Sequence, residues 1–131
     1  MKKDFYRWTT KKEALNDADG TALFHEREVW WCALGANIGF EQDGGPEAFE
    51  RPVVILKKFN LDARLIVPLT GRPKEGKYYF SVGRIADREA VAVLSQVRFI
   101  DRKRLENKIR TLDEDVFRSL AQAVVRTNFS L

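Results

Sequence analysis

Residues 52–70 read PVVILKKFNLDARLIVPLT and predict two adjacent β-strands. The first strand, residues 52–58, contains the apolar run 53–56. The second, residues 64–70, alternates its side chains between two faces, as a pleated strand does. Pro68 cannot donate a hydrogen bond to a neighbouring strand, which places it at an edge or a bulge. The stretch therefore predicts the centre of a mainly β protein.

Further strands are expected outward from this centre, at residues 28–34, 77–82 and 90–100. A Gly-rich loop over 35–50 separates the first strand from the central pair, and a short helical turn is expected at 101–105. Capping-box patterns at residues 10–13 and 111–114 predict a helix over about 11–18 and a closing helix that runs to about 126. Short links between five strands favour a small antiparallel barrel or curled sheet over a parallel α/β fold.

The domain organisation expected from this pattern is simple. Residues 1–22 are interpreted as an N-terminal helical extension, and residues 23–131 as a single barrel domain. Phe5, Trp8 and Leu15 are the large apolar side chains that could attach the extension to the main body or to a second copy.

The charge distribution points to an anionic partner. The net charge is +4, but residues 57–110 carry 14 basic and 6 acidic side chains. Such a local excess can attract RNA or an acidic protein, although a solvated basic surface is an equally simple explanation. The polar N-terminus, the single cysteine and the lack of a membrane-length apolar stretch predict a cytoplasmic protein without a membrane partner.

Several chemistries are disfavoured by the residues present. Residues 71–77, GRPKEGK, match most of a P-loop, but Tyr78 stands where the Mg²⁺-binding hydroxyl belongs. His25 is the one histidine, so cleavage of RNA by two histidines is excluded. No cofactor and no metal site are predicted.

The candidate site residues lie at strand ends and in the Gly-rich loop. Arg51 could clamp a phosphate and stabilise a pentavalent phosphorane, and Thr70 could bond the same phosphate. Gln42 and Gln96 could read base edges of single-stranded RNA. Taken singly, Arg51 is also explained as a loop-bracing surface residue, Thr70 as a strand-end cap, and Gln96 and Arg98 as the solvent-facing side of a strand.

Together these pieces resemble the PemK/MazF family of toxins from type II toxin–antitoxin systems, in its longer PemK-like subgroup. The likeness covers about residues 26–125 and rests on EVWWCALG at 28–35, GFEQ at 39–42, RPVVIL at 51–56, VPLT at 67–70 and LSQVRFID at 94–101.

The resemblance implies an SH3-like antiparallel barrel, a homodimer and an acidic antitoxin partner. It also implies metal-independent cleavage of single-stranded RNA, such as mRNA, at a short sequence, through a 2′,3′-cyclic phosphate. Arg51 and Thr70 would be catalytic. The RNA-binding residues would be Glu41, Gln42, Ser95, Gln96 and Arg98.

Two departures from the family pattern keep other functions open. Residues 45–50 lengthen the loop before Arg51, and the N-terminal extension has no counterpart in short members. The alternatives are a non-catalytic toxin of the same fold that binds a protein such as DNA gyrase, as CcdB-like toxins do, and a degenerate RNA-binding relative.

Overall fold

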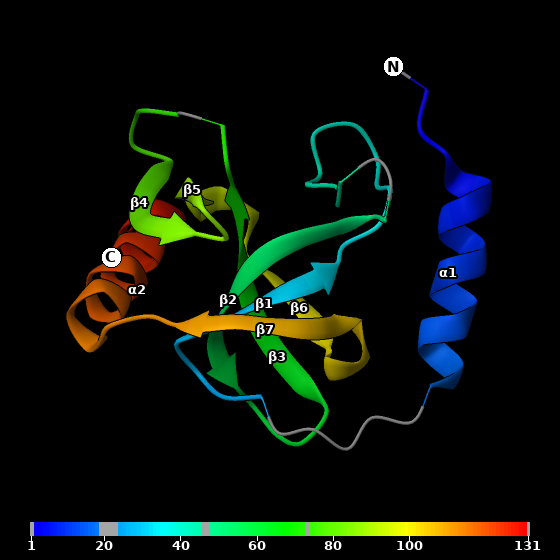
Figure 1. Cartoon of the computed structure of the whole chain (residues 1–131). Helices are drawn as coiled ribbons and strands as arrows, with labels where there is room; N and C mark the ends of the chain where they lie inside the picture. The colour runs from blue at the N-terminus through cyan, green and yellow to red at the C-terminus, as the bar shows by residue number, and fades with distance from the viewer. Residues whose placement is uncertain (1, 19–23, 46–47, 73, 131) are drawn as a thin grey trace.

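A curled antiparallel sheet forms the body of the protein, with one helix near each end of the chain (Figure 1). The computed structural model describes residues 2–18, 24–45, 48–72 and 74–130. The helices are α1 (Phe5–Asp17) and α2 (Glu114–Asn128). The remaining elements are β1 (Glu28–Ala33), β2 (Glu50–Lys58), β3 (Ala63–Thr70), β4 (Tyr79–Ile85), β5 (Arg88–Val93), the 3₁₀ turn η1 (Leu94–Gln96), β6 (Arg98–Asp101), η2 (Arg102–Arg104) and β7 (Leu105–Thr111).

The strands follow the order β4-β5-β3-β2-β1-β7, and β6 adds to β3. The central pair is antiparallel, with Val53 opposite Pro68 and Ile55 opposite Ile66. Strand β3 pairs with β2 along one edge and with β5 and β6 along the other, which bends the sheet into a half-barrel. The predicted mainly β fold, a curled antiparallel sheet with a closing helix and an N-terminal helix, is therefore confirmed.

Alternate residues of β2 enter different clusters of the core because successive side chains of a strand point to opposite faces. Val54 packs with Val29, Val67 and Leu120 of α2 in one buried cluster. Val53 and Ile55 belong to a second cluster on the other face, which also includes Cys32, Ile66 and Ile100. The second face of the sheet is the one that carries the site residues described below.

The strand predicted over residues 90–100 is two strands divided by η1. Leu69 faces Ala92 and Ile66 faces Arg98, so three steps along β3 correspond to six steps along its partner. The extra residues form η1, which shifts the register between β5 and β6. Apolar alternation continues across residues 90–100, which is why the sequence pattern did not reveal the break.

Strand β7 was not predicted. The helical turn expected at 101–105 exists as η2, and the chain then pairs with β1 along the sheet edge. The segment LENKIRT is mostly polar because the edge is largely exposed, so it lacks the apolar pattern of a strand.

Both capping-box predictions are wrong, although both helices exist. Helix α1 begins at Phe5, where the Asp4 carboxylate caps it by accepting from the Arg7 amide. Thr10 lies inside the helix and its hydroxyl donates to the Tyr6 carbonyl. Helix α2 is preceded by Asp113 as N-cap, whereas Thr111 ends β7.

The division of the chain at residues 22 and 23 lies outside the described residues and stays a prediction.

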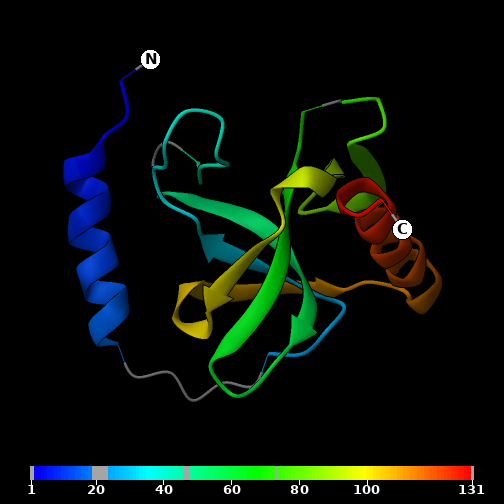
Figure 2. The same ribbon diagram turned by 180° about the vertical axis from the view of Figure 1, so that it is seen from behind.

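Helix α1 stands beside one end of the sheet, and α2 packs at the opposite end (Figure 2). Within the described part of the chain, no helix is long and apolar enough to cross a membrane.

Candidate functional site

Arg51 lies near the start of β2 and is anchored on two sides. Its Nε donates to the Asp43 carbonyl oxygen at 2.7 Å, and Nη1 donates to the Leu69 carbonyl oxygen at 3.3 Å. With the Gln42 amide oxygen turned toward the guanidinium, Arg51 Nη2 and Nε lie 3.0 and 3.1 Å from it. These contacts fix the plane of the guanidinium between the loop before β2 and the end of β3.

Thr70 ends β3 on the same face of the sheet. Val53 is paired with Pro68, and continuing this antiparallel register by two residues brings Arg51 opposite Thr70. The Thr70 side chain is nearly covered, and its Oγ1 accepts from the Arg72 amide at 3.3 Å. Arg51 Nη1 donates to the carbonyl oxygen of Leu69, the residue before Thr70, so the two residues predicted to be catalytic lie at neighbouring strand ends.

A second arginine lies close to this pair. Burial lowers the pKa of the Arg51 guanidinium below its ordinary value, and the positive charge of Arg72 lowers it further. Asp43 acts in the opposite direction and raises that pKa. Two neighbouring guanidinium groups with one carboxylate leave a net positive site, which favours a phosphate or another anion.

The predicted base-reading residues are partly occupied by contacts within the protein. The Gln96 side chain accepts from the backbone amide of Gln42 through Oε1 at 3.3 Å. Its Nε2 donates to the backbone carbonyl of Phe40 at 3.1 Å. Glu41 accepts from the Ile38 amide at 2.9 Å and so closes a turn. Gln96 therefore links η1 to the loop that contains Glu41 and Gln42.

Ser95 and Arg98 flank Gln96 in the chain but differ in exposure. Ser95 is exposed on η1, whereas Arg98 is half-buried on β6. Burial raises the pKa of the Cys32 thiol to about 12, and the nearby charges of Arg104 and Arg98 act against this rise. Arg98 lies opposite Ile66 on β3, and Ile66 shares the second core cluster with Cys32.

Three residues at this site were not predicted from the sequence. Arg72 was considered only as part of the P-loop-like segment 71–77. Asp43 was not singled out, although its backbone oxygen holds Arg51. Phe40 is fully exposed at the loop that carries Gln42, and an aromatic residue within a Gly-rich loop was the signal available in the sequence.

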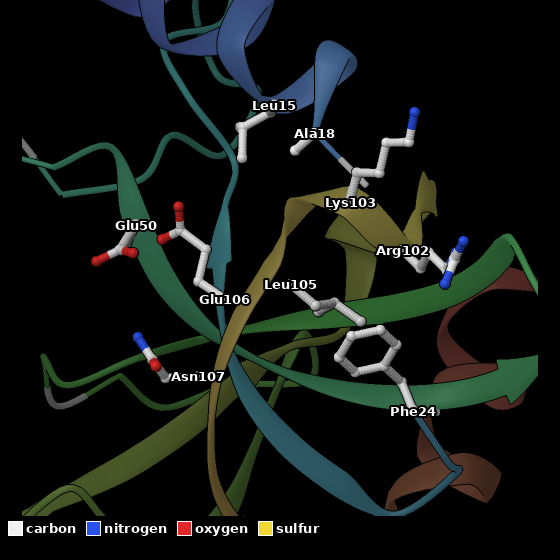
Figure 3. Close-up of a pocket in the computed structure, with 9 residues that line it drawn as sticks. All are labelled: Leu15, Ala18, Phe24, Glu50, Arg102, Lys103, Leu105, Glu106 and Asn107. Atoms are coloured by element: carbon white, nitrogen blue, oxygen red, sulfur yellow. The ribbon is translucent and has the colours of Figure 1, made fainter. Parts of the chain in front are cut away.

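A separate hollow of about 470 Å³ lies between the end of α1 and strand β7 (Figure 3). Leu15 and Ala18 project into it from the helix side, and Glu50 and Glu106 line the sheet side. None of the predicted site residues lines this hollow, so the Arg51 site is distinct from it.

In the described part of the chain, no group of three or more His, Cys, Asp or Glu residues could hold a metal ion.

Solved MazF structures share this fold. MazF from Deinococcus radiodurans is 17% identical with a TM-score of 0.66, and the match covers 82% of this chain and 97% of that one. Toxin MazF-mt6 of Mycobacterium tuberculosis is 16% identical with a TM-score of 0.60, covering 80% and 100% of the two chains. A mycobacterial endoribonuclease in complex with its cognate antitoxin is 11% identical with a TM-score of 0.57, covering 81% and 93%.

At these identities the structural likeness establishes the fold alone. No curated protein sequence matches the chain significantly. Residues 25–127, however, match the family described as PemK-like, MazF-like toxins of type II toxin–antitoxin systems. Because that match spans most of the sequence, the chain belongs to the PemK/MazF toxin family.

Proposed function

We propose that this protein is a toxin that cuts single-stranded RNA, such as mRNA, at a short sequence without a metal ion. The observation that carries the proposal is the placement of Arg51. Its guanidinium donates to the carbonyl oxygens of Asp43 and Leu69, Leu69 directly precedes Thr70 in the chain, and Arg72 lies nearby. The family to which the chain belongs is known for endoribonucleases, which agrees with this use of the site.

The proposed reaction is an internal transfer at one phosphate. The ribose 2′-oxygen loses its proton and attacks phosphorus, and the bond from phosphorus to the 5′-oxygen breaks. The products are a 2′,3′-cyclic phosphate and a 5′-hydroxyl, whose oxygen gains a proton. Because the nucleophile belongs to the substrate, the protein needs only to orient the phosphate, move protons and stabilise the extra charge.

Arg51 would stabilise that charge rather than remove the 2′-proton. Arginine has a pKa above about 12 in proteins and is a poor base, whereas its fork of N–H groups fits phosphate oxygens. Thr70 would hydrogen-bond the same phosphate through its hydroxyl group. Arg72 adds a second positive charge to a site that is already partly buried, where electrostatic interactions are stronger than in water.

The neighbouring loop and turn would bind the nucleotides that flank the cleaved phosphate. Ser95 and Arg98 offer a hydroxyl and a cation on either side of Gln96 in the chain. Glu41 and Gln42 lie in the loop that Gln96 contacts. Since Gln96 and Glu41 already hold loop amides and carbonyls, their contribution to specificity would include shaping the loop.

Two protein partners complete the proposal. A homodimer is expected from the family resemblance, with Trp8 now excluded from its surface because the Trp8 side chain of α1 is buried against Ala36 and Phe49 of the same chain. An acidic antitoxin would suit the basic residues 57–110. A mycobacterial endoribonuclease of the same fold is solved in complex with its cognate antitoxin, which supports this expectation.

The test is incubation of the purified protein with a long single-stranded RNA in EDTA. The wild type is compared with Arg51→Ala and with Arg118→Ala, which removes an exposed arginine of α2 as a matched control. Discrete fragments with 5′-hydroxyl ends are expected from the wild type and from Arg118→Ala. The Arg51→Ala variant should lose at least about a hundredfold in rate, because a charge-stabilising donor is removed.

Two outcomes would count against the proposal. Cleavage at the wild-type rate by a folded Arg51→Ala variant would remove Arg51 from the reaction. No cleavage of several RNAs by the wild type would instead favour a toxin that binds a protein target, or a degenerate RNA-binding protein.

A further inference from the structure

Helix α1 packs on the segment between β1 and β2, which we call the site loop (described residues 34–45, 48 and 49). The helix lies outside residues 25–127, the part of the chain that matches the family. Figure 1 and Figure 2 both show α1 standing next to this loop, away from α2. The contacts between them reach both ends and the middle of the loop.

Trp8 fixes the beginning of the site loop. Its ring lies against Gly35, where an added Cβ would come within 2.1 Å of Trp8 Cε2. The Trp8 ring also packs on Phe49 with centroids 5.7 Å apart, and the Gly35 amide donates to the Phe49 carbonyl at 3.1 Å. One buried side chain of α1 therefore contacts both ends of the loop.

Lys11 holds the end of the site loop. This end lies just before Arg51 in the chain. Its Nζ donates to the Ala48 carbonyl at 2.6 Å and lies 3.9 Å from a Glu50 carboxylate oxygen. The same ammonium group is 3.2 Å from a carboxylate oxygen of Glu106 on β7. The helix is thus fastened to the loop and to the sheet edge at once.

Lys3 fixes the middle of the site loop, just before α1 begins. Its Nζ is 2.8 Å from Asp43 Oδ2 and also donates to the carbonyl oxygens of Asn37 and Gly39. The other Asp43 carboxylate oxygen accepts from the Asn37 amide at 2.6 Å. The ammonium group therefore directs its donors at three oxygen atoms of one loop.

Asp43 connects Lys3 to Arg51. Its side chain binds Lys3, and its backbone carbonyl accepts from Arg51 Nε at 2.7 Å. The carboxylate and the carbonyl belong to one residue, so the position of the carboxylate constrains the direction of the carbonyl. The geometry points to Lys3 as a positioning residue for RNA cleavage, which orients Arg51 through Asp43 and makes α1 a clamp on the site loop.

This inference rests on the proposed function, since it assigns Lys3 a part in that reaction. A guanidinium that stabilises a phosphorane must be held in a narrow range of positions, because small displacements of a catalytic group lower the rate steeply. Without Lys3, the Asp43 carboxylate keeps the Asn37 amide but loses its cation. The loop then samples more positions, and Arg51 follows it.

The experiment compares Lys3→Met, Lys3→Arg and Lys12→Met with the wild type. Lys12 is exposed on α1 and serves as the matched control for loss of one positive charge. Lys3→Met should lower kcat about tenfold and leave KM within about threefold, because the phosphate-binding groups remain while their alignment is lost. Lys3→Arg should recover most of kcat, and Lys12→Met should behave as the wild type.

A wild-type kcat in Lys3→Met, or an equal loss in Lys12→Met, would overturn the assignment. A second measurement separates this inference from the proposed function. It is the hydrogen-exchange rate of the Asn37 backbone amide, which donates to the Asp43 carboxylate. If the wild type cuts no RNA, the proposed function fails, and faster Asn37 exchange in Lys3→Met still supports the clamp. Unchanged Asn37 exchange in that variant would refute the clamp whether or not RNA is cut.

Discussion

Replacing Gly35 with alanine should detach α1 from the rest of the protein. Gly35 follows β1 and has a φ of +82°, which side chains other than glycine rarely adopt. An added Cβ would lie 2.1, 2.3 and 2.6 Å from three ring carbons of Trp8. Distances this short are far inside van der Waals contact, so the Trp8 ring must move.

The Gly35→Ala substitution lowers the stability of the folded helix through two separate contributions. The left-handed backbone costs a non-glycine residue roughly 1–2 kcal/mol. Trp8 is 5% exposed. A tryptophan buries about 150–250 Å², which at about 25 cal/mol per Å² corresponds to an upper estimate of roughly 4–6 kcal/mol. If the ring leaves its site, most of that second amount is lost. A helix of 13 residues is marginal in water on its own. We therefore expect α1 to unfold while the sheet keeps its own core.

Hydrogen exchange of the α1 amides measures this directly. In Gly35→Ala the α1 amides should lose their protection, while the amides of β2 and β3 should remain protected. Gly39→Ala is the matched control, because Gly39 also has a positive φ, of +54°, but an added Cβ there meets no atom within 4 Å. That variant should show only the backbone cost and keep α1 protected.

A double-mutant cycle with Trp8→Ala tests the cause. Once the ring is removed, Gly35→Ala should cost only the backbone strain, so the two substitutions should be strongly non-additive. Protected α1 amides in Gly35→Ala would refute the reasoning. Additive effects in the cycle would show that the overlap with Trp8 is not what destabilises the helix.

Two further predictions concern RNA binding and pH. Phe40→Ala should weaken binding of single-stranded RNA about fivefold or more without changing the melting temperature, because the fully exposed Phe40 ring is free to stack on a base; equal affinity in a filter-binding titration would contradict this. Burial alone would raise the pKa of Glu28, but hydrogen bonds from the His25 amide, Trp30 Nε1 and Lys108 Nζ outweigh it and lower that pKa. The charged Glu28 therefore stabilises the fold above its ordinary pKa of about 4.3, and this stabilisation is lost as the pH falls through the lower folded value. Glu28→Gln should accordingly destabilise the protein at pH 7, and this effect should shrink as the pH falls below about 4, as measured by urea unfolding; an effect that does not change with pH would show that the charge is not involved.

The central strands were predictable because their side chains are buried on both faces or alternate clearly. The run 53–56 enters both core clusters, and residues 64–70 pair with β2 as expected. Strand β7 was not predictable in the same way. It forms an edge of the sheet, and few of its side chains are apolar and buried in the core. The break at η1 depends on a register shift against β3, which is a property of two segments rather than of one.

The placement of Arg51 near the end of β3 that carries Thr70 was also predictable, because β2 and β3 were expected as adjacent strands. Arg72 and Asp43 were not, since their importance depends on which loop atoms face the guanidinium. The same limit applies to Gln96, whose side chain bonds the Phe40 carbonyl although the two residues are 56 positions apart in the sequence. Its residue type indicates an amide that can read bases, but the structure shows that both ends of this amide hold the loop.

The two departures from the family pattern are joined in the structure. The longer segment 45–50 and the N-terminal extension lie more than 20 residues apart in the sequence, where nothing connects them. Phe49, within the longer segment, is buried against Trp8 of the extension and has a φ of 59° that is unusual for a bulky residue. Its carbonyl accepts from Gly35, and its amide donates to the Gly45 carbonyl at 2.8 Å. A longer loop beside Arg51 would loosen the site unless something held it, and α1 supplies contacts at both of its ends. The extension and the longer loop are therefore best understood as one structural unit that sets the position of Arg51.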